Sequence, residues 1–462
     1  MAGKQLTRRQ VLGASTAVLA GAALTPTRGL ARGRRAGQEF AGKTVTVGTI
    51  DGELGNGVQA QMAAFEAATG ARIELVRIPQ DELQTKITAD LTSGAGTFDV
   101  IIEPFILLHG HAAAGFYLPL EEFTAEDPDV DLEDFIPLLL QGQGYYNDTL
   151  YGLPYKADAY IFFYRKDLFG DPAVQGAFSA QVGRELAVPQ TVPELVETAR
   201  FFTREFNPES PTEFGWSHMA AEGTNPLYIW ASRLAVYGGS YVDENFRPNF
   251  NNDAGRRAME VAIQLNECCP PDVGSYSWEE ANTAYLTGRV AMMEQWPGLA
   301  KIAETEEGFW GRSEVIGKTG YAPMVGDDVG GQLVRSSILG GWTAAVSKFA
   351  EDPQLAYRTV AFLTGKEGEP LKIPAGNDPC RQSTYANPEI AEANPLYPVL
   401  QENLAQGRIT PDPDAPPVSA ELGTEMATVF NRVWSGQLGG EEALVEVEER
   451  WTDILRRARL TD

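Results

Sequence analysis

Few residues in this chain have the types and spacing that nucleotide chemistry requires. Residues 37–44 match the phosphate-loop pattern G-x-x-x-x-G-K-T letter for letter. A phosphate loop follows a strand and opens a helix, because backbone amides and the helix dipole must face the phosphates. Here the order is reversed, since the segment leads into a β-branched run at residues 45–50 that predicts a strand. The context therefore argues against nucleotide binding.

Carboxylates and nucleophiles show no catalytic spacing either. Asp127, Asp129 and Asp131 open like a calcium loop, but Leu132 stands where that loop needs glycine, so a solvated acidic loop is expected. No G-x-S-x-G segment occurs. The 63 acidic residues offer many carboxylate pairs of the glycosidase kind, and no spacing singles one out. The sequence thus contains no recognisable catalytic motif.

The N-terminal 36 residues differ in charge from the rest of the chain. They hold seven basic residues and no acid, and removing them changes the net charge from −26 to −33. Arg8 and Arg9 precede an uncharged stretch at residues 11–27, which is typical of a twin-arginine export signal. That stretch is shorter than the ~20 apolar residues of a membrane span, so an uncleaved anchor is the weaker alternative. The acidic body argues against binding nucleic acid or an anionic membrane.

The scarce histidines and cysteines favour packing over metal binding. His109 and His111 flank a glycine, and no spacing is typical of zinc. The three cysteines are Cys268, Cys269 and Cys380, and an odd number in an exported chain leaves at least one thiol free. A bridge from the vicinal pair to Cys380 stays open at this point.

Length and element pattern predict at least two α/β lobes. A chain of 462 residues exceeds what one hydrophobic core usually serves. Strands predicted at residues 45–50, 73–78 and 98–102 alternate with helices at 58–69 and 83–91. Such alternation implies a parallel sheet covered by helices. Later helices are expected after three N-terminal caps: Thr191 with Glu194, Ser277 with Glu280, and Asp352 with Pro353.

Several segments together resemble the extracellular solute-binding proteins of ABC importers, in the large carbohydrate-binding group. Each segment alone is a weak signal, but their order and spacing cover nearly the whole exported chain. They include AGFYLPL within residues 96–120, LYGLPY at 150–155, YRKDLF at 164–169, QWPG at 295–298 and GGW at 340–342.

The resemblance implies an α/β, two-lobed periplasmic-binding-protein fold, type II-like, with a hinge and a ligand cleft between the lobes. After an export signal at residues 1–36, it places 43–154 plus 289–339 in lobe I. Residues 155–288 plus 340–462 then form lobe II.

Matching positions supply candidate aromatic surfaces for a sugar. Sugars present apolar C–H faces and a rim of hydroxyls, so a site needs aromatic plates and fixed polar groups. Trp296 matches a tryptophan that follows a short strand, and Trp342 matches one after paired glycines. Gly341 would let the backbone approach the ligand. The alternative for both tryptophans is a place in the core.

The resemblance also indicates three charged residues. Glu103 ends a strand of the first sheet, where open α/β sheets place ligands, and its alternative is a helix cap before Pro104. Asp158 matches a ligand acid, with a buried hinge network as its alternative. Arg381 matches an arginine that reaches the cleft in some relatives and would hold a hydroxyl or phosphate oxygen, with a surface salt bridge as its alternative.

The implied function is an exported, non-catalytic binding protein that captures a sugar, oligosaccharide or polyol and delivers it to an ABC permease. No cofactor, metal or nucleic acid is expected, and the protein should act as a monomer. Its expected location is periplasmic or otherwise extracytoplasmic, and membrane-associated if the signal is not cleaved. Alternatives are a secreted carbohydrate-active enzyme, a glycerophosphodiester or sugar-phosphate binder of the same fold, and a sensor subunit.

Overall fold

A computed structural model describes residues 39–223, 225–306, 313–409 and 418–461. The predicted export signal lies outside these ranges. The described ranges pack as one unit. In the described ranges, no helix is both long and apolar enough to cross a membrane.

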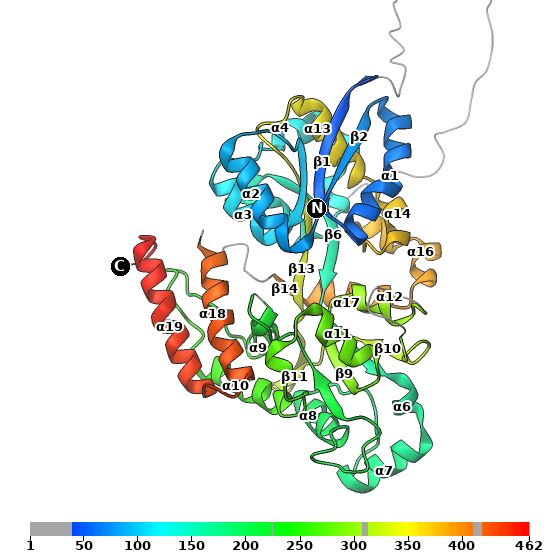
Figure 1. The fold of residues 1–462 in the computed structure, drawn as a ribbon, viewed down its shortest axis with the longest axis vertical. Helices are drawn as coiled ribbons and strands as arrows, with labels where there is room; N and C mark the ends of the chain where they lie inside the picture. Colours follow the sequence, from blue (N-terminus) through cyan, green and yellow to red (C-terminus); the bar gives the residue numbers. More distant parts are fainter. Residues whose placement is uncertain (1–38, 224, 307–312, 410–417, 462) are drawn as a thin grey trace, which may run out of the picture. The chain divides into compact units, whose positions relative to one another are not determined.

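The first sheet begins with the predicted strand–helix alternation (Figure 1). Strands β1 (Thr44–Ile50), β2 (Arg72–Ile78) and β3 (Val100–Pro104) are parallel, with β1 between the other two. Helices α1 (Glu53–Thr69) and α2 (Leu83–Ser93) connect them, as the apolar spacing predicts. Because β1 starts at the last residue of the phosphate-loop match, that match leads into a strand, which confirms the reversed context.

Two long strands join this sheet from distant parts of the chain. β13 (Ile338–Val346) runs antiparallel to β3 on one side and to β6 (Gly152–Ala159) on the other. The short β14 (Arg408–Ile409) pairs with β13 at the sheet edge. Helix α13 (Pro353–Leu363), capped by the Asp352 carboxylate as predicted, packs against β13 and α1. Every residue of β6 is buried, so β6 and β13 form a fixed pair in the interior.

The second sheet has four strands in the order β10-β7-β9-β8. These are β10 (Thr319–Ala322), β7 (Ile161–Arg165), β9 (Val290–Gln295) and β8 (Phe214–Ser217). β9 is antiparallel to β7 and parallel to β8, and all of its residues are buried. Helix α8 (Val192–Phe201) starts at the predicted Thr191–Glu194 capping box and packs against β8.

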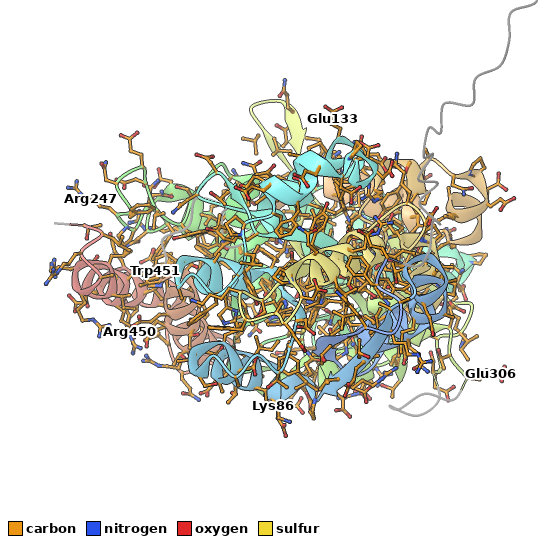
Figure 2. The ribbon with its side chains drawn as sticks, turned by 90° about the horizontal axis from the view of Figure 1, so that it is seen from above. Lys86, Glu133, Arg247, Glu306, Arg450 and Trp451 are labelled. Atoms are coloured by element: carbon orange, nitrogen blue, oxygen red, sulfur yellow. The ribbon has the colours of Figure 1, made fainter. Side chains whose placement is uncertain are left out.

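A group of amphipathic helices lies beyond the second sheet. α18 (Ser419–Trp434) and α19 (Gly440–Arg457) pack against each other and against α10 (Asp253–Asn266). In α19 the Trp451 indole is buried and donates to the Leu422 carbonyl oxygen, while the neighbouring Arg450 pairs with acids at the surface (Figure 2). The remaining helices and strands are α3 (Phe105–Ala113), α4 (Glu121–Glu126), α5 (Pro137–Gly144), β4 (Tyr145–Tyr146), β5 (Thr149–Leu150), α6 (Lys166–Gly170), α7 (Pro172–Val182), α9 (Tyr228–Val236), α11 (Trp278–Leu286), α12 (Gly298–Ala303), β11 (Asp327–Val329), β12 (Gln332–Val334), α14 (Glu369–Lys372), α15 (Gln382–Tyr385), α16 (Pro388–Ala393) and α17 (Tyr397–Gln406).

Sheet membership differs from the predicted lobe boundaries. The prediction groups residues 289–339 with the first sheet, whereas β9 and β10 pair inside the second. It groups residues 340–462 with the second sheet, whereas most of β13 and all of α13 belong with the first. Strand pairing is a non-local property, and a fully buried, mainly apolar strand such as β9 has the same sequence pattern in either sheet. Helices α18 and α19 do pack on the side to which the prediction assigned them, and α17 contacts both β6 and β7.

Candidate functional site

The pairing of β6 with β13 brings three of the predicted residues together. Asp158 lies opposite Gly340, and Lys156 lies opposite Trp342, with Gly341 between them. The register shifts just after Trp342, which marks a bulge in the pair. Bulges re-aim side chains and are common beside functional sites. The antiparallel ladder therefore places Asp158, Gly341 and Trp342 in one region.

Buried charges occupy this region. The Lys156 ammonium lies 2.8 Å from an oxygen of Asp158 and 3.0 Å from an oxygen of Glu53. Lys156 and Asp158 are only 2% and 6% exposed, and Asp378 lies in the same electrostatic environment. We call Glu53, Lys156, Asp158 and Asp378 the Lys156 cluster. It joins the start of α1, strand β6 and the chain after α14.

Burial and charge act in opposite directions on these groups. Burial raises the pKa of Asp158 to about 6, although the Lys156 charge opposes the shift. Burial likewise raises the pKa of Asp378 to about 8, again against the pull of Lys156. Burial alone would lower the pKa of Lys156, but the carboxylates of Asp158, Glu53 and Asp378 outweigh it and raise that pKa. One ammonium group is thus shared among three acids.

Trp296 stands at the end of β9 in a group of aromatic rings. Its ring centroid lies 4.4 Å from that of Tyr160 and 5.7 Å from that of Tyr228, both edge-on. A Cβ atom on Gly340 would lie 2.8 Å from the Trp296 ring, so the missing side chain lets the indole lie against β13. Trp296 is half-buried, which leaves part of its surface for contact with a ligand.

A cavity of about 570 Å³ adjoins this region. Glu53 and Asp378 of the Lys156 cluster line it, together with Pro297, which directly follows Trp296. Other lining residues include Thr319, Tyr321 and Tyr397 and the charged Lys166, Lys301 and Glu304. The volume lies in the range of small-molecule sites, and the lining combines apolar surface with polar and charged groups. The cavity is therefore suited to a small polar ligand.

None of the six predicted site residues lines this cavity itself, and Glu103 is held in a separate network. Its side chain is fully buried, the Tyr117 hydroxyl donates to it over 2.7 Å, and the His111 ring nitrogen lies 3.1 Å from both carboxylate oxygens. It is not the cap of α3 either, since Pro104 holds that position. Glu103 therefore connects β3 with α3 and the chain that follows, because its carboxylate oxygens have hydrogen-bond partners that are near in sequence.

Arg381 is also turned inward. It has no exposed surface, and its guanidinium donates to the carbonyl oxygens of Val130, Asp131 and Thr364 and to the Asp134 carboxylate. The predicted alternative, a surface salt bridge, does not describe it. A buried guanidinium bonded to backbone carbonyls fixes the chain around it and is not accessible to a ligand.

The cysteines and histidines form no site in the described part of the chain. Cys268, Cys269 and Cys380 are buried and free, so the disulfide left open by the sequence is not formed. The described ranges contain no group of three or more His, Cys, Asp or Glu that could hold a metal ion.

Sequence reasoning missed Lys156, Glu53 and Asp378. Two signals were available. Lys156 and Asp158 are two apart on one strand, so their side chains leave the same face. Glu53 follows β1 closely, and ligands of open α/β sheets gather at the carboxyl ends of strands. Asp378 gave no signal, because its environment is created by residues far away in sequence.

Comparisons with known proteins agree with this architecture. Residues 51–370 match the sequence model of the family described as bacterial extracellular solute-binding protein. The chain is 28% identical over 359 residues to a probable amino-acid ABC transporter periplasmic-binding protein of Sinorhizobium fredii, which covers 76% of this chain and 75% of the relative. It is 25% identical over 443 residues to the mannitol-binding protein of Pseudomonas aeruginosa, covering 90% and 94%.

A solved structure shows the same two-lobed fold. The solute-binding protein of an ABC transporter from Agrobacterium radiobacter K84, in complex with ribitol, superimposes with a TM-score of 0.74 at 24% sequence identity. The similarity covers 90% of this chain and all of the other. This likeness establishes the fold.

Proposed function

Because the chain belongs to the bacterial extracellular solute-binding protein family, we propose that it is the substrate-binding protein of an ABC importer and that its ligand is a sugar or polyol. The proposed ligand class rests on one observation: the half-buried Trp296 ring lies next to buried carboxylates and a 570 Å³ cavity. An indole face suits the C–H surface of a sugar, and carboxyl groups suit its hydroxyls.

The named relatives support this ligand class unequally. A mannitol-binding protein and a ribitol complex favour a polyol. The Sinorhizobium relative is named for amino acids. The phosphate-ester alternative loses its main support, because Arg381 is buried and bonded to protein groups. The same proposal includes export of the protein, delivery of the ligand to a permease, action as a monomer and the absence of turnover.

Calorimetric titration of the purified chain with a panel of ligands tests the assignment. The panel should hold polyols, mono- and oligosaccharides, amino acids and glycerophosphodiesters. We expect saturable binding of one sugar or polyol, recovered chemically unchanged after incubation. Binding of an amino acid without any sugar or polyol would contradict the ligand class, and consumption of a glycan would contradict the binding role.

Replacing Trp342 by alanine should weaken binding of that ligand by at least ~1 kcal/mol, about fivefold in Kd, because an aromatic contact is lost. Calorimetry measures the affinity, and circular dichroism shows that the fold is kept. Phe206→Ala serves as the matched control, since Phe206 is an aromatic residue 38% exposed at the surface. An unchanged Kd in a folded Trp342→Ala protein would remove this residue from the site.

A further inference from the structure

Asp378 is held in place on both sides by hydrogen bonds to different elements. The Ala157 amide of β6 donates to the Asp378 carbonyl oxygen. The neighbouring Asn377 side chain donates to the Glu53 carbonyl oxygen over 2.7 Å. Two residues further on, the Cys380 amide donates to the Glu369 carboxylate. The backbone that carries the Asp378 carboxyl group is therefore rigid.

The Asp378 side chain is buried, no described residue donates a hydrogen bond to its carboxyl group, and its oxygens are not among the fully enclosed polar atoms, as expected of a group at a cavity wall. Asp378 is 6% exposed and lines the 570 Å³ cavity. Lys156, the cation with the largest electrostatic effect on Asp378, is already engaged by Asp158 at 2.8 Å and Glu53 at 3.0 Å. Buried polar groups almost always have a hydrogen-bond partner, so a carboxyl group left without one beside a cavity indicates a ligand.

The charges that surround Asp378 disfavour its ionised form. Burial is the largest cause of its raised pKa, the Lys156 charge opposes it, and the acids of the cluster add to it. At neutral pH the group therefore holds its proton for most of the time. The titratable groups that face it are Lys156 and Asp158 on β6, Glu53 on α1, Lys372 on α14, Tyr385 on α15 and Tyr397 on α17.

We propose that Asp378 contacts the ligand in this cavity and that its protonated carboxyl group exchanges hydrogen bonds with a ligand hydroxyl. A protonated carboxyl both donates and accepts, as a hydroxyl group does, whereas a carboxylate only accepts. This proposal rests on the proposed function and adds a residue and a proton to it. Ligand capture then depends on the protonation of Asp378.

The direction of the pH dependence follows from this contact. Binding favours the protonated form, so the affinity is constant below the pKa of Asp378 and falls above it. Where the bound state requires the proton, the loss reaches about tenfold in Kd per pH unit. The fall should start near pH 8, where the pKa of Asp378 lies.

The pH dependence is tested by measuring the Kd of the full chain by calorimetry between about pH 6 and pH 9.5. The ligand is mannitol, or the tightest binder among the polyols and sugars. Asp378→Asn keeps a donor and an acceptor but no titratable proton. We expect it to bind within about threefold of the wild type near pH 6 and to show a flat profile. Asp328→Asn, an exposed change in the β11–β12 hairpin, should keep the wild-type slope.

A measurement on the wild type alone covers the case in which Asp378→Asn does not fold. Titrations near pH 8.5 in buffers of different ionisation enthalpy should show net proton uptake on binding. Proton uptake of zero, or an unchanged slope in folded Asp378→Asn, would overturn the Asp378 contact while leaving ligand capture intact. Absence of any sugar or polyol binding would overturn the proposed ligand class, and the hydroxyl contact with it.

Discussion

Replacement of Lys156 by methionine is expected to lower the free energy of unfolding by about 3–5 kcal/mol, because it leaves buried carboxylates without their cation. Lys156 is 2% exposed and is the cation that pairs with Asp158 and Glu53. Methionine fills a similar volume, so the loss reports charge more than packing. Chemical denaturation followed by circular dichroism measures it.

The pH dependence of this loss identifies its cause. Asp158 has its pKa raised to about 6 even with Lys156 present. Without the ammonium its carboxyl group should retain a proton to still higher pH. At about pH 5 the carboxyl groups of Asp158 and Asp378 are largely neutral, so the difference between variant and wild type should be smaller there than at about pH 8. A difference that stays constant with pH would point to packing instead.

Lys86 provides the matched lysine-to-methionine control. It forms an ion pair with Glu82 at 2.6 Å on the surface of α2, where the side chains are 53% and 49% exposed (Figure 2). Surface pairs of this kind contribute at most about 1 kcal/mol, so Lys86→Met should change stability by less than that. A loss for Lys156→Met no larger than that for Lys86→Met would contradict the role given to the buried cation.

Local features of the fold could be predicted from the sequence, because their causes lie within a few residues. The strand–helix alternation from β1 to β3 follows from apolar spacing, and the capping box of Thr191 with Glu194 appears as predicted. The sheet to which β9 belongs could not be predicted, since pairing with β7 and β8 joins segments far apart in the chain. Long-range pairing leaves no local signal.

The same distinction applies to the candidate site. Asp158, Gly341 and Trp342 are brought together by one strand pair, and family likeness pointed to them. Glu103 was predicted from its position at a strand end. That position does not reveal that His111 and Tyr117 would enclose its carboxylate. Asp378 acquires its character from Lys156 and Glu53, which are distant in sequence. The residue type shows which chemistry a side chain can perform. Its contacts in the fold determine whether the side chain is accessible to a ligand.

Gly341 is expected to be the glycine least tolerant of substitution around the site. Its φ of 124° lies in the region that side chains rarely adopt. A Cβ atom there would also overlap the Gln143 side-chain amide and the Lys156 carbonyl oxygen. Backbone strain of about 1–2 kcal/mol and overpacking of about 1–3 kcal/mol together predict that Gly341→Ala lowers the free energy of unfolding by about 2–5 kcal/mol.

A substitution at Gly330 separates the backbone strain from the steric overlap. Gly330 also has a positive φ, 68°, but a Cβ atom there meets nothing within 4 Å. Gly330→Ala therefore carries the backbone strain alone and should lose only about 1–2 kcal/mol. Denaturation of both variants under the same conditions gives the steric part as the difference between them. If both variants lost the same free energy of unfolding, Gln143 and the β6 backbone would be able to move aside. The close approach of β13 to Lys156 would then not be needed to hold the Lys156 cluster in place.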